Sequence, residues 1–152
     1  MKWRFGPDIM DIDSDVIADI EVLSPEASKD AWIRYVHPKA THLLDPALAY
    51  YRDERTVVWQ DVVVDGPHLL SKCPSDHRPT HEDEILVFWS ANRCARTRVR
   101  TALEVWEHLL YPGGSVEFVV PERKVSMTII NELGTVAVIH YWPYQRRPVQ
   151  LT

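Results

Sequence analysis

Potential metal ligands recur at every fourth residue in the stretch CPSDHRPTH, and a second cysteine follows thirteen positions later; the set is Cys73, His77, His81 and Cys94. Thiolate sulfur and imidazole nitrogen are ligands that zinc binds tetrahedrally. A four-residue step brings two histidines together only on a helix, and two prolines interrupt this segment. The tight Cys-x2-4-Cys knuckle typical of structural zinc sites is missing. We therefore expect a proline-stiffened loop with no metal and no other cofactor, and we keep a metal-dependent enzyme as an alternative.

The same four residues also suggest a thiol enzyme. A nucleophilic cysteine must become a thiolate, which requires a neighbouring base or a positive charge. Cys73 has His77 nearby in sequence, and Cys94 stands among arginines at the expected start of a helix, where the dipole favours an anion. The sequence contains neither a Gly-x-Ser-x-Gly elbow nor a glycine-rich phosphate loop. We expect no enzymatic activity, and thiol chemistry stays open as part of the same alternative.

Acidic residues dominate the first quarter of the chain. The net charge is -5, and residues 8 to 30 contain eight acids against one base, Lys29. Such a segment serves solubility or attracts a basic partner protein, because complementary potentials accelerate encounter and exclude wrong partners. Exposed aromatic side chains are typical anchors of protein interfaces. The predicted contact residues are therefore four acids and one tryptophan: Asp11, Asp13, Asp15, Asp19 and Trp59.

Nucleic acid is disfavoured as a partner because the chain is acidic overall. The one basic cluster, which lies close to Trp89, consists of Arg93, Arg96, Arg98 and Arg100. Arginines beside an aromatic ring suit RNA binding. However, Glu104 and Glu107 follow on the expected helix, where glutamates near Arg100 can pair with it. A partly salt-bridged surface is the preferred interpretation.

The chain of 152 residues contains no internal repeat and no long linker, which predicts a single globular domain over residues 1–152. No apolar run approaches the roughly 20 residues that span a bilayer, so no membrane partner is expected. The first residues, MKWRFGPDIMDID, lack the apolar stretch of a secretory signal. Two cysteines are too few for a disulfide framework. Together these features predict a cytoplasmic protein with reduced thiols.

The hydrophobic pattern predicts an α+β fold with an antiparallel sheet of about five strands and two or three helices. Ser24, Pro25 and Glu26 mark the start of a helix that ends at Pro38, and Asp45-Pro46 marks a second, shorter one. Apolar spacing predicts the longest helix over residues 95–110, whereas the type of residues 14–23 stays open. The expected strands are TVVWQDVVVD, EILVFWS and a C-terminal meander of SVEFVV, KVSMTIIN and TVAVIHYW.

Residues Glu82 to Val119 resemble one known family. The shared features are Asp83, the apolar-aromatic strand EILVFWS, a helix with Ala102 and Leu103, and a strand entered by Val116-Glu117. This order is similar to the closing half of tryptophan-rich immunity proteins of bacterial polymorphic toxin systems, which neutralise nucleic-acid deaminases and nucleases. The family pattern has tryptophan where this chain has Phe118, and it ends where this chain continues. The resemblance implies a small acidic α+β protein that binds and blocks another protein.

The leading hypothesis from the sequence is a non-enzymatic immunity or inhibitor protein that occludes the active site of a basic toxin domain. A metal-dependent or thiol enzyme built on the cysteines and histidines is the first alternative. A secretion chaperone, a class that is also small and acidic, is the second.

Overall fold

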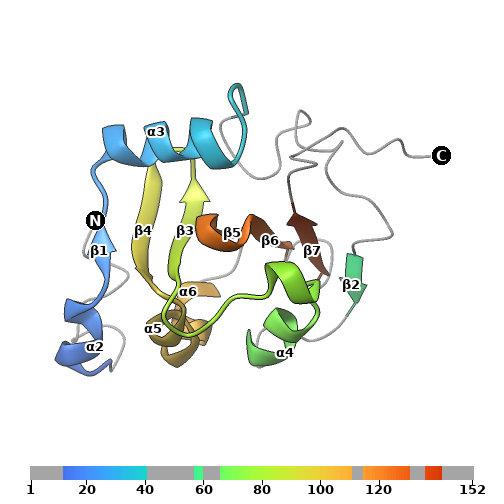
Figure 1. The fold of residues 1–152 in the computed structure, drawn as a ribbon. Coiled ribbons are helices and arrows are strands. Elements are labelled where there is room, and N and C mark those ends of the chain that lie inside the picture. The colour runs from blue at the N-terminus through green and yellow to red at the C-terminus, as the bar shows by residue number, and fades with distance from the viewer. Residues whose placement is uncertain (1–11, 41–56, 60–65, 111–114, 131–135, 142–152) are drawn as a thin grey trace.

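The computed structural model describes residues 12–40, 57–59, 66–110, 115–130 and 136–141. Within these ranges the chain forms one seven-stranded antiparallel sheet in the order β1-β4-β3-β5-β6-β7-β2 (Figure 1). The strands are β1 (Glu21–Val22), β2 (Val57–Trp59), β3 (Glu84–Ser90), β4 (Arg93–Arg98), β5 (Val116–Val120), β6 (Val125–Ile130) and β7 (Val136–Tyr141). The helices are α2 (Ser14–Ala18), α3 (Pro25–Tyr35), α4 (Gly66–Ser71), α5 (Val99–Glu104) and α6 (Trp106–Leu110), with 3-10 turns η4 (Ser75–His77) and η5 (Pro121–Arg123). The predicted α+β class is confirmed, because helices pack on one mainly antiparallel sheet. Five strands of this sheet are long, and its two edge strands are short.

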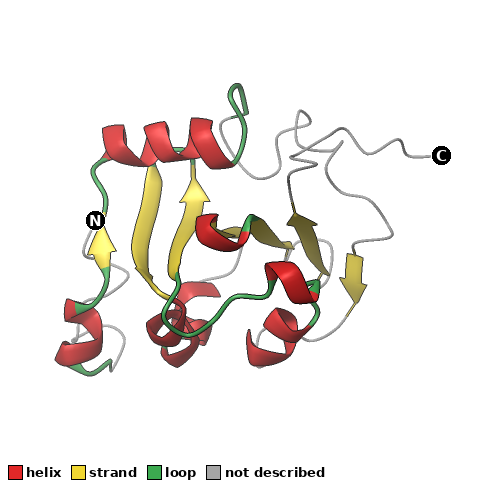
Figure 2. Cartoon of the chain, viewed as in Figure 1, coloured by secondary structure: helices red, strands yellow, loops and turns green. Residues whose placement is uncertain are grey.

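The central strand β3 is buried on both of its faces. Ile85 and Val87 point to one side of the sheet and join a large core cluster, whereas Leu86 and Phe88 point to the other side and join a smaller one. Successive side chains of a strand alternate between the faces, so a continuous apolar run such as ILVF needs cover on both sides. Helices therefore pack against both faces; in the view of Figure 2, α3 lies above the strands and the remaining helices lie mostly below them.

Four short helices form a layer on the face of the larger cluster. Buried residues of α4, α5 and α6, such as Leu69, Ala102 and Leu109, pack in that cluster, and Val16 and Ile17 of α2 pack against it. Trp106 stacks on Phe118 of β5 with ring centroids 4.7 Å apart. We call α2, α4, α5 and α6 together the helical layer.

The opposite face is covered by α3. Ser24 caps this helix by accepting a hydrogen bond from the Ala27 N–H at 3.1 Å, and Pro25 occupies the first turn, as the sequence predicts. Trp32 lies in the smaller cluster, where its ring meets Phe88 edge to face at 5.7 Å. Because α2 and α3 lie on opposite faces, the acidic first quarter does not form one surface.

The junction between β1 and α3 is completed by a buried serine. The Leu23 N–H donates to the Cys94 carbonyl, but the chain then turns into α3 and leaves the Cys94 N–H without a strand partner. The Ser28 hydroxyl, which is fully buried, accepts that hydrogen bond at 3.1 Å. A side chain of the helix thus replaces a backbone group of the sheet.

The predicted C-terminal meander is present. β5 pairs with β6 and β6 pairs with β7, both antiparallel, with Phe118 opposite Met127 and Met127 opposite Ile139. The turn between β5 and β6 is η5, and it closes with Lys124 in the left-handed region at φ 53°. This turn lies against the start of β3, where it contributes to the site described below.

One sequence prediction about elements is wrong. Residues 95–110 do not form one helix, because their first part is strand β4 and the backbone of Val105 separates α5 from α6. The helix α4, which begins at Gly66-Pro67, was not expected from the sequence. The stretch 14–23, left open between helix and strand, contains both: α2 and then β1. The helix expected at Asp45-Pro46 and most of TVVWQDVVVD lie outside the described residues.

We expect the substitution Ser28→Ala to lower the free energy of unfolding by about 1–3 kcal/mol, because it leaves the buried Cys94 N–H without an acceptor. Chemical denaturation measures this change directly. The matched control is Ser75→Ala, at an exposed position of η4, which should stay within about 0.5 kcal/mol of the parent protein. Equal stability of the two variants would contradict this account of the junction.

Candidate functional site

The stretch CPSDHRPTH packs against the turn between β5 and β6. The His77 Nδ1–H donates to the Arg123 carbonyl oxygen at 2.8 Å, which fixes the tautomer because a carbonyl oxygen only accepts. Arg78 donates to the carbonyl oxygens of Ser71 and Cys73 at 3.0 and 3.1 Å and so satisfies groups at the end of α4. The expected loop is confirmed, with only the one-turn η4 inside it.

Asp83 anchors this corner of the molecule. Its carboxylate accepts hydrogen bonds from the Arg123 Nε–H at 2.7 Å and from the Thr80 N–H at 2.8 Å, while its side chain is only 5% exposed. Burial raises the pKa of Asp83, but the hydrogen bonds and the positive charge of Arg123 outweigh it and hold the pKa below its usual value. The Asp83 carbonyl also accepts from the Val99 N–H, so one residue joins the loop, β3 and α5.

The structure does not bring the four potential metal ligands together. Cys73 lies in the larger core cluster with its thiol 3.9 Å from the Met127 sulfur, whereas Cys94 lies in the smaller cluster on the other face of the sheet. His77 is bonded to Arg123, and His81 is exposed. Across the described part of the chain, no three His, Cys, Asp or Glu side chains are placed to hold a metal ion.

Neither cysteine lies where a thiolate is favoured. Burial raises the pKa of the Cys73 thiol to about 11, with Arg78 opposing the shift weakly. Burial raises the pKa of the Cys94 thiol to about 12. Cys94 lies within β4, opposite Phe88, and not at the helix start that the sequence predicts. The geometry therefore supplies no activated thiol at these two positions.

Three arginines of the cluster form ion pairs with two glutamates. Arg96 binds Glu21 of the neighbouring strand at 2.6 Å, and Arg98 binds Glu82 at 2.9 Å. Arg100 also binds Glu82 and not the glutamates that follow it on the chain, so the predicted pairing within the helix is wrong. A partly salt-bridged surface was the preferred interpretation of these residues, and these pairs agree with it.

Three of the predicted contact acids gather on α2. Asp13 is the N-cap and accepts from the Asp15 N–H at 3.2 Å, Asp15 follows in the first turn, and Asp19 ends the helix. All three side chains are exposed, and none has an ion-pair partner among the residues the structure describes. Asp11 lies outside the described residues. The end of α2 is fixed to the sheet because the Thr97 hydroxyl donates to the Asp19 carbonyl at 2.9 Å.

Trp59 and these acids lie at opposite edges of the sheet. It lies on β2, which is the last strand at one edge of the sheet, whereas β1, the strand that follows α2, is the last strand at the other edge. Six strand-to-strand steps of about 4.8 Å separate the two edges. The predicted contact set is therefore split into two places about 29 Å apart along the sheet.

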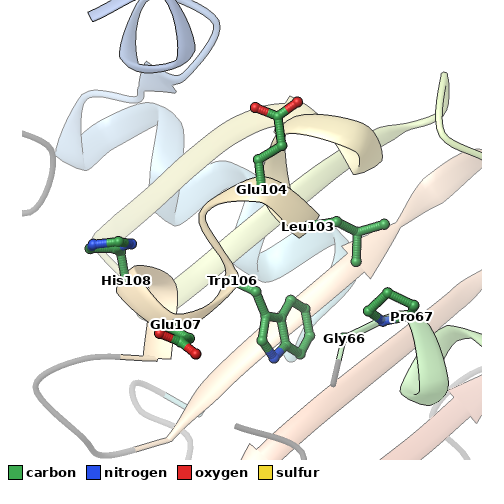
Figure 3. A pocket seen from close by; sticks show the side chains of 7 residues that line it. All are labelled: Gly66, Pro67, Leu103, Glu104, Trp106, Glu107 and His108. Atoms are coloured by element: carbon green, nitrogen blue, oxygen red, sulfur yellow. The ribbon is translucent and has the colours of Figure 1, made fainter. Parts of the chain in front are cut away.

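A small pocket opens on the helical layer between the start of α4 and the junction of α5 with α6 (Figure 3). Its volume is about 200 Å³, and it is lined by Gly66, Pro67, Leu103, Glu104, Trp106, Glu107 and His108. A Cβ added at Gly66 would lie 2.8 Å from a ring carbon of Trp106, so glycine is needed for the close approach of α4. The sequence analysis missed this pocket, because α4 was not expected and Glu104 and Glu107 were assigned to Arg100.

Sequence analysis also missed the burial of Glu117. This residue lies in the middle of β5, is 1% exposed, and accepts a hydrogen bond from the hydroxyl of Thr128 directly across on β6. A buried carboxylate is costly unless it is paired by hydrogen bonds. The available signal was an acid inside the otherwise apolar strand VEFVV, at a position where the alternation of a two-sided core leaves no exposed face.

A scan against protein families, curated proteins and solved structures found no match to this chain. The resemblance over Glu82 to Val119 thus remains a prediction from the sequence. Structurally, this region contains β3, β4, α5, α6 and β5, with β4 in the place where the resemblance implied a loop and the start of a helix. In the described ranges, no helix has the length and apolar character needed to cross a membrane.

We expect Asp83→Asn to lower the free energy of unfolding by about 2 kcal/mol at pH 7, because hydrogen bonds to a charged group are lost at a buried position. A group whose pKa is lowered in the folded state contributes its stability above the unfolded-state pKa and loses it as the pH falls through the folded-state pKa. The difference in the free energy of unfolding between the parent protein and Asp83→Asn should therefore reach its full size above about pH 4 and become smaller below it. Denaturant titrations over this pH range measure it.

The control for this experiment is Glu82→Gln, which removes exposed ion pairs and should change the stability by less than about 1 kcal/mol. If the stability difference between the parent protein and Asp83→Asn did not change with pH, the negative charge of Asp83 would not stabilise the fold as described.

We expect both thiols of the native protein to react with a disulfide reagent at pH 8 at least about 100-fold more slowly than an ordinary exposed thiol, since burial leaves them protonated. Unfolding the protein in denaturant should release both thiols at once. Absorbance of the released thiolate follows the reaction. A native thiol that reacts at the unfolded rate would restore the thiol enzyme as an alternative.

Proposed function

We propose that this protein is a non-enzymatic binding protein, and that the acidic surface of α2 binds a basic protein partner. This proposal rests on how the two charged clusters of the chain are paired: the arginines form ion pairs within the chain, and the acids of α2 do not. The arginines Arg96, Arg98 and Arg100 are paired with glutamates of the same chain. Asp13, Asp15 and Asp19 are exposed and have no such partner in the described part of the chain. Of these six residues, only the α2 acids have no ion-pair partner in the described part of the chain.

The class of partner that suits this surface is a toxin domain with a basic substrate-binding surface. An enzyme that acts on nucleic acid carries such a surface because it must neutralise phosphates. An acidic protein bound over that surface occludes the active site and needs no chemistry of its own. The resemblance of Glu82 to Val119 to immunity proteins supports the same class. A cytoplasmic location is part of this proposal.

The structure narrows the contact set proposed for binding. Asp13, Asp15 and Asp19 belong to one short helix and its two caps, and the end of this helix is tied to the sheet. Trp59 lies at the other edge of the sheet and is left out of this contact. The arrangement predicts binding that depends on charge and therefore on ionic strength.

The test is titration of the protein against the purified product of the neighbouring gene. We expect tight binding that weakens with salt, and we expect the triple substitution Asp13→Asn, Asp15→Asn, Asp19→Asn to weaken it roughly tenfold or more, mainly through slower association. Asparagine at position 13 keeps the capping hydrogen bond, so α2 should stay folded. Calorimetry and surface-binding kinetics give the affinity and the association rate.

The matched control changes two acids on the opposite face, Glu26→Gln and Asp30→Asn in α3, and should leave the affinity unchanged. No binding by the parent protein, or equal binding by the α2 variant, would overturn the proposal. Loss of binding in the α3 variant alone would also overturn it.

A further inference from the structure

The chain reverses its direction directly after α3 (Figure 1), and one histidine side chain holds this reversal together. The Nδ1 atom of His37 accepts hydrogen bonds from two backbone groups, the Lys39 N–H at 3.0 Å and the Ala40 N–H at 2.9 Å. A backbone N–H only donates, so Nδ1 carries no proton and the neutral ring has its proton on Nε2. We call residues 37–40 the histidine turn.

The histidine turn places Ala40 in the core. Ala40 is 3% exposed and belongs to the smaller core cluster, together with Trp32 and Val36. The Trp32 indole N–H donates to the Ala40 carbonyl oxygen at 2.5 Å. Both backbone groups of Ala40 are thus satisfied by side chains, the N–H by His37 and the carbonyl by Trp32. Loss of either partner leaves a buried backbone group unsatisfied, which is unfavourable.

Proton uptake by His37 is incompatible with this arrangement. A protonated imidazole donates at both ring nitrogens, so it offers no acceptor to the two backbone N–H groups. Hydrogen bonds that favour the neutral form of a group move its protonation to lower pH. The stability that these bonds contribute is therefore complete while the ring is neutral, and it is lost as the pH falls and the ring takes up a proton.

The charged groups around the histidine turn act in both directions. Arg34 precedes His37 by three residues and Lys39 follows it by two, and both cations oppose a further positive charge. The carbonyl end of α3 favours a cation. On β1, β3, β4 and β5, the titratable side chains of the face that α3 covers are Glu21, Glu84, Cys94, Arg96, Arg98 and Glu117. The groups in direct contact with Nδ1 are the two N–H donors, and both oppose protonation.

We propose that His37 is an acid-sensitive switch, which keeps the histidine turn closed on Trp32 at neutral pH and opens it when the ring is protonated. Opening separates Ala40 from the Trp32 indole and loosens the smaller core cluster on the α3 face of the sheet. The helical layer packs on the other face, so the α2 acids stay in place. Acid thus changes one face of the protein and leaves the other unchanged. This inference does not depend on the proposed function.

The test is an NMR titration of the 15N-labelled protein from about pH 8 to about pH 5, the range around the usual protonation of histidine. We expect long-range 1H–15N spectra to show His37 at pH 8 with its proton on Nε2 and none on Nδ1. As His37 takes up its second proton, the Trp32 indole N–H signal should shift with the same midpoint. The hydrogen-exchange protection of the Lys39 and Ala40 amides, corrected for the intrinsic pH dependence of exchange, should fall about tenfold or more, because two hydrogen bonds are lost.

The variant His37→Asn separates the switch from the turn itself. An asparagine side-chain oxygen accepts hydrogen bonds from backbone N–H groups two or three residues further on, and it does not titrate in this pH range. We expect the Trp32 signal of this variant to stay unchanged down to pH 5. His37→Ala has no acceptor and should show the acid form of the Trp32 signal already at pH 8. The matched control is His81→Asn, which removes an exposed histidine and should leave the transition as in the parent protein.

A proton on Nδ1 of His37 at pH 8 would overturn this inference, because that atom would then donate and not accept. A Trp32 signal that does not follow the His37 titration would overturn it as well. The same holds for a transition that persists in His37→Asn or disappears in His81→Asn. The spectra of the parent protein test the position of the proton and the shared midpoint without any substitution, so the inference can be refuted even if a variant does not fold.

Discussion

The burial of β3 and β5 on both faces determines the rest of this structure. β5 contains five consecutive buried residues and β3 contains four. An antiparallel sheet with such strands cannot leave one face in water, because each face would expose a row of large apolar side chains. The chain must therefore supply helices for both faces. This requirement separates α2 from α3, divides the acidic first quarter between two faces, and places the pocket on the same face as the α2 acids.

Local signals in the sequence were sufficient for some elements and not for others. The start of α3 was predictable because Ser24, Pro25 and Glu26 each favour a helix start. The meander was predictable from β-branched runs separated by short turns. In residues 95–110 the apolar spacing favoured a single helix, but Ala95 and Thr97 are buried in β4 and Arg96 stands between them. Pairing with β3 determines that segment, and a pairing partner far along the chain is invisible to a local pattern.

The candidate site was predictable only where it depends on residue type and short-range geometry. The exposure of Asp13, Asp15 and Asp19 follows from acids at the two caps and in the first turn of a short helix. Cys73 and Cys94 are separated because they pack against opposite faces of the sheet. Their spacing in the sequence does not specify which face each one joins. The same holds for Glu82, which binds Arg98 and Arg100 because the start of β3 lies beside the end of β4. Sequence spacing assigned Arg100 to another glutamate, and the sheet register decides otherwise.

The pairing of charges within the chain decides which charges are left for a partner. Exposed ion pairs such as Arg96 with Glu21 stabilise the fold little, typically by less than about 1 kcal/mol. Their larger consequence is electrostatic, since each paired glutamate offsets one positive charge in the field that an approaching molecule meets. Glu82 is shared by Arg98 and Arg100, so it offsets only one of these two charges. The net charge of -5 is thus not spread evenly. Among the described residues of the helical layer, the acids without an ion-pair partner are those of α2 together with Glu104 and Glu107, and a basic partner is attracted to this layer by them.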